Sequence, residues 1–230
     1  MDMYGVKDKS IPQKVTLMSV ETIIVVVSGW ILFFGGFEWL AGLFGAGQVS
    51  AGNHGRRIIL FVFILISYAR FWITTTILLQ RKMPWEEVIS VSFAFLLYYV
   101  GFGLLGYESK QPLDSLDVIG TFIFLFGGWL NTAGEMKRYY WKKRPENKGK
   151  LYTGGYFRYA MHINYFGDIL WVSGFAILTR NWYSVIIPLW LIAFFLFFNI
   201  PKLDAYLAGK YGKAFEDYRK KTKKLFPFIY

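Results

Sequence analysis

The chain has 230 residues, of which 55% are hydrophobic and 21% aromatic, and its formal net charge is +11. The mean hydropathy of +0.35 is higher than one soluble core of this size usually needs, so we expect lipid to cover much of the apolar surface. Cysteine is absent and histidine occurs only as His54 and His162. This excludes disulfides, thiolate catalysis and a metal site built from cysteine and histidine, and no metal ligands are predicted.

Apolar residues fall in six blocks that are separated by polar segments. In chain order these are residues 22–40, 58–79, 88–105, 116–130, 165–178 and 182–200. Several approach the roughly 20 residues that a helix needs to cross about 30 Å of hydrocarbon. The first block is longer than the apolar region of a signal peptide, so we interpret it as a retained helix. The blocks predict an all-α, polytopic membrane protein with about six transmembrane helices.

The basic residues test this topology, because cytoplasmic loops are enriched in Lys and Arg. With the N-terminus inside, the outer loops hold only Arg56, Arg57, Lys110 and Arg180 of the 26 basic residues. Arg70 lies within the second block, and all the others fall on the cytoplasmic side. Both termini are therefore expected in the cytoplasm. The positive charge would attract the anionic headgroups of membrane lipids, and no motif suggests a nucleic-acid partner.

The blocks divide the chain into two unequal parts. Residues 1–130 read as N-terminal transmembrane helices with short loops, and residues 131–230 begin with a polar stretch and end in a charged tail. The fifth block is short, and the polar residues Arg180 and Asn181 lie between it and the sixth. This spacing predicts a tight helical hairpin in the second part.

Polar residues that follow the fourth block recur on one helix face. Asn131, Glu135 and Arg138 have spacings that place them on the same side, where they could hold a ribose or an amide. Lys142 and Arg144 follow and would suit phosphate groups, because both residues give charge-assisted donors. An ordinary basic flank on the cytoplasmic side is the simpler explanation from composition alone.

A second polar cluster precedes the fifth block. Gly154 and Gly155 are expected to open a turn there. The polar residues that follow are Tyr159, His162, Asn164, Tyr165 and Asp168. Asn164 and Asp168 are four residues apart and would point the same way, and a carboxylate near a helix N-terminus is favoured. Alternatively, Asn164 caps the helix and the tyrosines belong to an interfacial aromatic belt.

The tail contains Tyr211 and Tyr218 before a basic run and an aromatic C-terminus. It reads as an amphipathic segment on the membrane surface whose lysines face lipid headgroups. It could also close over the cluster that precedes the fifth block.

These residues resemble the C-terminal domain of the membrane steroid 5α-reductases and related bacterial membrane proteins. The resemblance covers about residues 131–230. It rests on Asn131 followed four residues later by Glu135, on basic residues before Pro145, and on the segments HINYFGD, YGKAFEDY and FPFIY. It implies a cytoplasm-facing NADPH site built from these segments and a lipophilic substrate that comes from the bilayer. Separately, the lack of an organelle signal favours a bacterial inner membrane. The implied cofactor-binding residues are Asn131, Glu135, Arg138, Lys142, Arg144, Tyr159, His162, Asn164, Tyr165, Asp168, Tyr211 and Tyr218.

The sequence departs from this family at several positions. Glu135 stands where Asp is usual and Asp168 where Glu is usual, which keeps both charges. The catalytic candidates are Glu38, Tyr68 and Arg70, with Tyr68 as hydrogen-bond donor to a substrate carbonyl. A structural pair between Glu38 and Arg70 inside the membrane is an equally good explanation. The implied reaction is hydride transfer from NADPH to the β-carbon of an enone or similar alkene.

Two alternatives to the reductase stay open. A membrane methyltransferase of the isoprenylcysteine or phospholipid type would use S-adenosylmethionine, but such enzymes carry Arg and Pro where this chain has Met161 and Ile163. They also tend to have paired glutamates where this chain has Lys202, Leu203 and Asp204. A non-catalytic membrane scaffold would bind neither cofactor. The identity of the substrate and the oligomeric state are left open.

Overall fold

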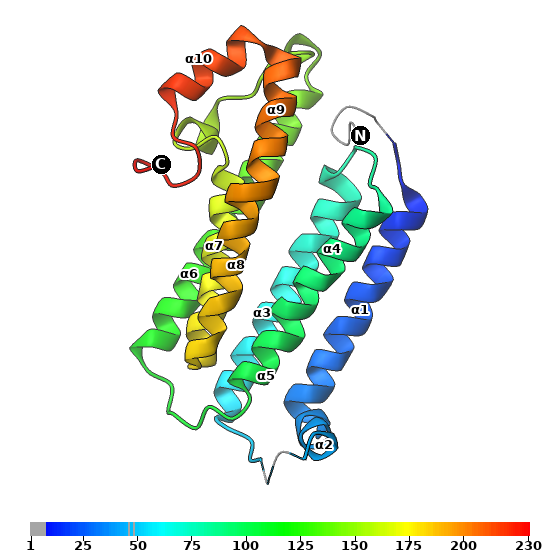
Figure 1. Ribbon diagram of the computed structural model, residues 1–230, viewed down its shortest axis with the longest axis vertical. Coiled ribbons are helices and arrows are strands. Elements are labelled where there is room, and N and C mark those ends of the chain that lie inside the picture. Colours follow the sequence, from blue (N-terminus) through cyan, green and yellow to red (C-terminus); the bar gives the residue numbers. More distant parts are fainter. Residues whose placement is uncertain (1–7, 46, 48) are drawn as a thin grey trace.

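The computed structural model describes residues 8–45, 47 and 49–230, and this part of the chain is a bundle of helices without a strand (Figure 1). Among the described residues, five helical stretches are long and apolar enough to cross a membrane: Ile11–Phe33, His54–Leu78, Trp85–Gly106, Ser115–Lys143 and Trp182–Tyr211. Ile163–Thr179 is apolar but shorter. Together they match the six predicted blocks, so the prediction of an all-α polytopic membrane protein is confirmed.

The α-helices are α1 (Ile11–Phe33), α2 (Gly36–Leu43), α3 (His54–Ile73), α4 (Trp85–Leu96), α5 (Phe102–Gly106), α6 (Ser115–Lys143), α7 (Ile163–Thr179), α8 (Ile186–Phe194), α9 (Ile200–Tyr211) and α10 (Lys213–Lys221). Single π-helical turns continue α3 (Thr74–Leu78), join α4 to α5 (Leu97–Gly101) and join α8 to α9 (Phe195–Asn199). Short 3₁₀ turns lie at Pro145–Asn147, Gly155–Arg158 and Trp182–Val185.

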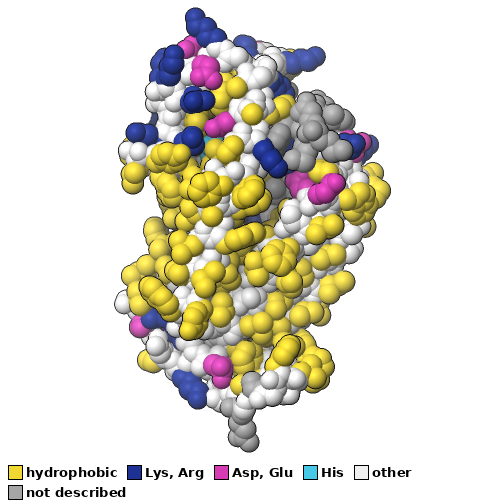
Figure 2. Space-filling view, in the orientation of Figure 1, with side chains coloured by type: hydrophobic (Ala, Val, Ile, Leu, Met, Phe, Trp, Pro, Cys, Tyr) yellow, Lys and Arg dark blue, Asp and Glu magenta, His cyan; other side chains and the backbone are white. Residues whose placement is uncertain are grey.

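The two ends of the bundle differ in charge. In Figure 1, α10 and α9 lie at one end and α2 at the other, and we name these the α10 end and the α2 end. Figure 2 shows apolar side chains around the middle of the molecule and most Lys and Arg side chains at the α10 end. The start of α1 lies at the same end as α10, as expected when both termini are on the basic side.

The first span differs from its prediction. Helix α1 begins at Ile11, where Pro12 occupies the first turn and favours helix initiation. It ends at Phe33 because Gly35 adopts a left-handed conformation with φ of 79°. Glu38 therefore lies on the separate helix α2 and is exposed, so its predicted burial within the first span is wrong.

Helices α6 and α7 are the most closely packed pair of the bundle. Their contact is lined by glycines spaced seven residues apart, Gly120 and Gly127 on α6 and Gly167 and Gly174 on α7. A Cβ on Gly167 would lie 2.7 Å from the backbone nitrogen of Asn131, and a Cβ on Gly174 would lie 2.6 Å from the carbonyl oxygen of Gly120. Small residues allow such a close approach of membrane helices. This approach brings Asn131 beside the start of α7.

Aromatic residues from several helices form the core. Phe63 on α3 stacks on Phe124 of α6 with centroids 3.8 Å apart, and Phe102 of α5 stacks on Phe175 of α7 at 5.2 Å. Both parts of the predicted division thus share one hydrophobic core. Residue 130 lies inside α6. The predicted division of the chain at this residue therefore stays a prediction about function.

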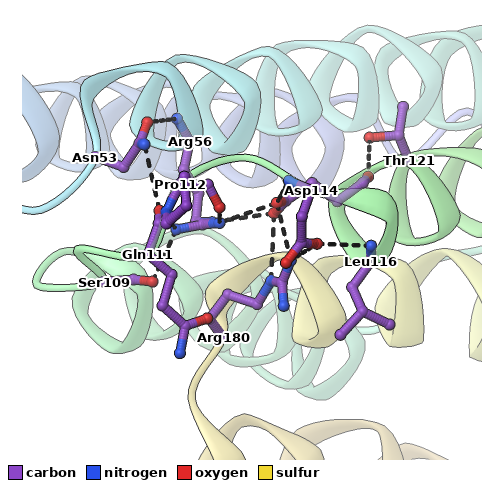
Figure 3. Close-up of polar contacts among 10 residues, drawn as sticks. Asn53, Arg56, Ser109, Gln111, Pro112, Asp114, Leu116, Thr121 and Arg180 are labelled. Atoms are coloured by element: carbon purple, nitrogen blue, oxygen red, sulfur yellow. Dashed lines mark hydrogen bonds and ion pairs between the residues drawn. The ribbon is translucent and has the colours of Figure 1, made fainter.

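The α2 end is closed by a buried network of charged groups (Figure 3). The Arg56 guanidinium donates to both carboxylate oxygens of Asp117, at 3.0 and 2.9 Å, and also to Ser109 Oγ at 2.9 Å. It further donates to the carbonyl oxygens of Gln111 and Pro112. Arg180, which ends α7 with φ of 57°, donates to Asp117 at 3.0 Å. The network ties α3, α6 and the predicted α7–α8 hairpin together, and that hairpin is confirmed.

The C-terminal segment folds back on the turn before α7. The backbone N–H groups of Met161 and His162 donate to the carbonyl oxygens of Lys223 and Lys224, at 2.8 and 3.0 Å. The Tyr218 hydroxyl donates to the carbonyl oxygen of Phe157 at 2.5 Å. The tail therefore closes over the second polar cluster, as one of the two sequence interpretations predicts.

Candidate functional site

A cavity of about 680 Å³ lies in the half of the bundle nearer the α10 end. Its wall is built by α3, α4, α6, α7, α8 and the turn between α8 and α9. Aromatic and aliphatic side chains form most of it, including Phe71, Phe95, Tyr98, Trp171 and Leu191. Four predicted site residues also line it: Arg70, Asn131, Tyr165 and Asp168. A mainly apolar cavity with a few convergent polar groups is the usual form of a small-molecule site.

Arg70 is the centre of the polar side of this cavity. Its Nε donates to Thr132 Oγ1 at 2.9 Å and its Nη2 donates to Asn131 Oδ1 at 3.2 Å. Its guanidinium also lies 5.7 Å from the ring centroid of Trp171. Asn131 Nδ2 in turn donates to the carbonyl oxygen of Asn164 at 3.1 Å. These bonds hold α3, α6 and α7 together at the cavity wall.

Asp168 places a carboxylate beside this group. It accepts a hydrogen bond of 2.8 Å from the indole nitrogen of Trp171, one turn further along α7. Arg70 and Asp168 interact electrostatically across the cavity wall. Asn164 is inside α7, whose N-cap residue is His162, so the alternative that Asn164 caps the helix is wrong.

Tyr165 and His162 connect the cavity to α9. The rings of His162 and Tyr165 stack with centroids 5.4 Å apart, and Tyr165 stacks on Phe195 at 4.5 Å. The buried imidazole of His162 lies 2.9 Å, Nε2 to Oδ1, from Asp204 on α9. Sequence reasoning did not single out Asp204 as a site residue. His162 therefore fixes the position of Tyr165 rather than lining the cavity itself.

A second group of predicted residues lies further along α6. Glu135 and Arg138 form an ion pair, and Arg138 stands over the ring of Phe157 at 5.4 Å. The Oε1 atom of Glu135 is buried and has no hydrogen-bond partner in the part of the chain that the structure describes. Tyr218 bonds to the backbone of Phe157, and burial raises the pKa of its hydroxyl. Lys142 interacts electrostatically with both Arg138 and Glu135.

Three further predicted cofactor residues belong neither to the cavity wall nor to the groups around Glu135 and His162. Arg144 is exposed at the end of α6. Tyr159 is 38% exposed and its ring contacts Phe228. Tyr211 is at the end of α9 beside Lys210. None of the three lines the cavity.

Of the three catalytic candidates, one lines the cavity and two lie elsewhere. Glu38 lies at the α2 end, where its carboxylate accepts a hydrogen bond from Tyr107, so the predicted pairing of Glu38 with Arg70 is wrong. Burial, and then this hydrogen bond, raise the pKa of Tyr107 to about 12. Tyr68 shares a hydrogen bond of 2.7 Å with Thr22 on α1 and does not line the cavity. Arg70 alone of the three does.

The structure adds one acidic residue that sequence reasoning missed. Glu21 on α1 is fully buried, and neither of its carboxylate oxygens has a hydrogen-bond partner among the described residues. Within the same part of the chain, the Tyr99 hydroxyl and Ser67 Oγ are also buried without partners, and Tyr99 interacts electrostatically with Glu21, Tyr68 and Arg70. Ser67 lines the cavity, so these unpartnered groups lie behind its wall. Glu21 immediately precedes the first predicted apolar block, residues 22–40, and an acidic residue at the edge of an apolar block was the signal that could have identified it.

Comparison with known proteins identifies the family of this chain and several relatives. A family model described as "Protein of unknown function (DUF1295)" matches residues 87–222, more than half of the chain. The chain is 28% identical over 190 residues to steroid 5-alpha-reductase DET2 of Gossypium hirsutum, which covers 73% of this chain and 70% of the relative. It is 28% identical over 162 residues to 3-oxo-5-alpha-steroid 4-dehydrogenase 2 of Mus musculus, covering 66% of this chain and 61% of the relative.

A relative with a different activity is about as similar. The chain is 28% identical over 192 residues to a probable protein-S-isoprenylcysteine O-methyltransferase of Oryza sativa subsp. indica, covering 79% of this chain and 87% of the relative. The predicted resemblance to the steroid 5α-reductases is confirmed, and the matched region begins well before residue 131. Because the chain spans only 61% of the mouse relative, the activity and substrate of that protein do not transfer directly.

Proposed function

We propose that this chain, which belongs to the DUF1295 family, is a membrane oxidoreductase that uses NADPH to reduce a polarised C=C bond in a lipophilic substrate. The similarity to steroid 5α-reductases supports the class of enzyme. The observation that carries the proposal is the group formed by Arg70, Asn131 and Asp168 on the wall of a mainly apolar cavity. The substrate would be steroid-like, isoprenoid or another lipid.

The residues present fit a dinucleotide cofactor. The amide of Asn131 and the carboxylate of Asp168 offer the donor and acceptors that a carboxamide needs. Further along α6, the unpartnered Oε1 of Glu135 would accept a hydrogen bond from a ribose hydroxyl. Arg138 and Lys142 would bind phosphate oxygens. A cavity of about 680 Å³ has the volume of a ligand site but is smaller than a whole dinucleotide with substrate, so the phosphates would lie outside it.

When bound, NADPH would supply a hydride to the β-carbon of the alkene. The chain itself would hold the carbonyl group of the substrate and stabilise the negative charge that develops on its oxygen. Arg70, which lines the cavity, would do this, and Glu21 in its neutral, protonated form would relay through Tyr99 the proton that completes the reduction at the α-carbon. Tyr68, the donor predicted from sequence, already shares a hydrogen bond with Thr22 and would support Tyr99 from the side.

A methyltransferase that uses S-adenosylmethionine is the second candidate. Its support is the rice relative, of which the chain covers 87%, more than it covers of either reductase. The polar cluster around His162 and Asn164 would then hold the amino-acid part of that cofactor. In either case, we place the protein in a bacterial inner membrane, where lipids and a lipophilic substrate are its partners and nucleic acid is not.

Cofactor binding separates the candidates. The detergent-purified protein is titrated calorimetrically with NADPH, NADH and S-adenosylmethionine, and the same titrations are made with Asp168→Asn. The variant keeps the acceptor for Trp171 and loses only the charge. Asp217→Asn, on the exposed surface of α10, is the matched control. We expect NADPH to bind, and the loss of one charged hydrogen bond to weaken it roughly tenfold in Asp168→Asn alone.

The other outcomes are equally informative. Preference for S-adenosylmethionine would establish the methyltransferase candidate and exclude the reductase. If no cofactor binds while the protein keeps its thermal unfolding transition, the chain is not a reductase and the scaffold alternative gains support. Equal weakening in both variants would mean that Asp168 does not contact the cofactor.

A further inference from the structure

Between α4 and α8 the cavity wall is made of aromatic side chains. Phe93 on α4 and Trp190 and Phe194 on α8 line the cavity, and these residues are 52, 42 and 36% exposed. Helix α4 packs on α1 and α8 packs on α7. In the part of the chain that the structure describes, α4 and α8 are not among the closely packed helix pairs. The interior of the cavity is thus separated from the surroundings here by side chains alone.

One aromatic contact spans this wall. The rings of Phe93 and Trp190 meet edge to face, with centroids 6.4 Å apart and an interplanar angle of 80°. Such a contact is weak enough to break readily, because it changes an equilibrium by about tenfold at most. Rotation of either side chain would open the cavity without any movement of the helices.

The surface around this contact is apolar. Helices α4 and α8 lie at the front of Figure 1, and Figure 2 shows that apolar side chains cover the middle of this face. Phe198, which also lines the cavity, is 58% exposed on the same side. Lipid is therefore the medium that faces this wall.

The lining changes in character towards the α10 end. There it includes Arg81, Glu87 and Lys202, and Arg81 forms an ion pair with Glu87 at 2.6 Å. A polar rim suits access from water, and an aromatic wall suits access from hydrocarbon. The cavity therefore has two approaches with opposite chemistry.

We propose that Phe93 and Trp190 form a side gate through which a lipophilic substrate passes between the bilayer and the cavity. Its polarised end would point towards Arg70 and Asp168, and its apolar tail would lie between α4 and α8 against Phe194. The identity of the ligand as a substrate rests on the proposed function, but the gate itself does not. One consequence is that the tail need not fit within the cavity, so the volume does not limit the length of the substrate.

The absence of cysteine allows a direct test in lipid vesicles. Ala94 lines the cavity beside Phe93 and is half-buried, so Ala94→Cys places one thiol at the gate. Its labelling rate is measured with N-phenylmaleimide, which dissolves in the bilayer, and with a charged sulfonated methanethiosulfonate, which does not. Ser90→Cys, at an exposed position on the cavity lining, shows that both reagents are active.

The gate is then opened by Phe93→Ala with Trp190→Ala. The matched control is Phe122→Ala with Phe126→Ala, which removes a stacked aromatic pair on α6 that is 68 and 42% exposed and does not line the cavity. We expect the gate variant to label about three- to tenfold faster with the apolar reagent, the factor that one lost edge-to-face contact corresponds to. The charged reagent should be unaffected, and so should the control variant.

Equal rates in the gate and control variants would overturn the proposal. So would an equal acceleration of both reagents, which would mean that the cavity opens to water at this wall, and so would failure of Ala94→Cys to react with either. Titration of the same variants with NADPH keeps the two proposals separate. Faster labelling of the gate variant without NADPH binding would contradict the proposed reductase and support the gate. NADPH binding without faster labelling would support the reductase and contradict the gate.

Discussion

Arg56 and Asp117 form a two-point ion pair that is buried at the α2 end, with side chains 0 and 4% exposed. The other N–H groups of Arg56 reach Ser109, Gln111 and Pro112, so the charge is fully hydrogen-bonded. Removing one partner leaves the other as a buried, uncompensated charge. We expect Asp117→Leu to lower the free energy of unfolding by roughly 3 to 5 kcal/mol.

Denaturation in detergent, followed by circular dichroism, measures this change. The control is Glu216→Gln, which removes an exposed pair with Arg219 at 3.9 Å and should change stability by less than about 1 kcal/mol. Similar effects of the two substitutions would show that the buried network contributes little to the fold.

A second prediction concerns pH. The pKa of Asp114 lies below its ordinary value, because the backbone N–H of Leu116 donates to the carboxylate and because Arg180 donates to it as well. A lowered pKa in the folded state means that the stabilisation is fully present above the pKa of the unfolded state and is lost as the pH falls through the folded value. Acid should therefore lower the free energy of unfolding of the native protein more than that of the Asp114→Asn variant.

The melting temperature, measured in steps from pH 7 to pH 3, tests this difference. The two curves should run parallel down to about pH 4 and converge below it. Asp217→Asn, on the exposed surface of α10, should lose as much melting temperature in acid as the native protein does. Curves that stay parallel down to pH 3 would show that Asp114 does not contribute to acid sensitivity.

Gly167 should tolerate no side chain. Its Cβ would lie 2.8 Å from the carbonyl oxygen of Gly127 and 3.0 Å from the side chain of Asn131. We expect Gly167→Ala to separate α6 from α7 and to destabilise the protein by about 1 to 3 kcal/mol. Since Asn131 would also move, NADPH should bind more weakly.

The matched control for this substitution is Gly209→Ala on α9, where nothing lies within 4 Å of the added Cβ. It should leave NADPH binding unchanged and stabilise the helix by up to about 1 kcal/mol. Thermal unfolding and calorimetry on both variants decide the matter. If Gly167→Ala is as stable as the native protein, the close approach of the two helices is not required.

Glu21 gives a prediction of the opposite sign. A buried carboxylate without a partner opposes folding, so Glu21→Leu should stabilise the protein by about 1 to 3 kcal/mol. The same change should abolish reduction of an enone by the proposed enzyme while NADPH still binds. A residue that destabilises the fold in this way is typical of functional sites.

Glu38→Gln is the comparison, because this carboxylate is exposed and accepts a hydrogen bond from Tyr107. It should be neutral or slightly destabilising. A loss of stability in Glu21→Leu would mean that Glu21 has a structural partner and is not held for chemistry.

The sequence alone determined the class of fold and the position of most helices. Runs of apolar residues report a lipid environment directly, and charge reports which loops remain in the cytoplasm. The ends of α7, and those of α3 together with its π-helical turn, lie within a few residues of their predicted blocks. The end of α1 was not predicted correctly. Gly35 ends the helix by its backbone conformation, while the hydrophobic pattern of the sequence continues through Glu38.

Periodicity along one helix also predicted that Asn131 and Glu135 share a face, and that Asn164 and Asp168 do. Which of these faces meet was decided by tertiary structure, because the contact depends on how closely α6 and α7 approach at their glycines. For the same reason Arg70 pairs with Asn131 and not with Glu38. That Glu21 has no partner among the described residues became visible only in the folded chain, since a missing partner is a property of packing.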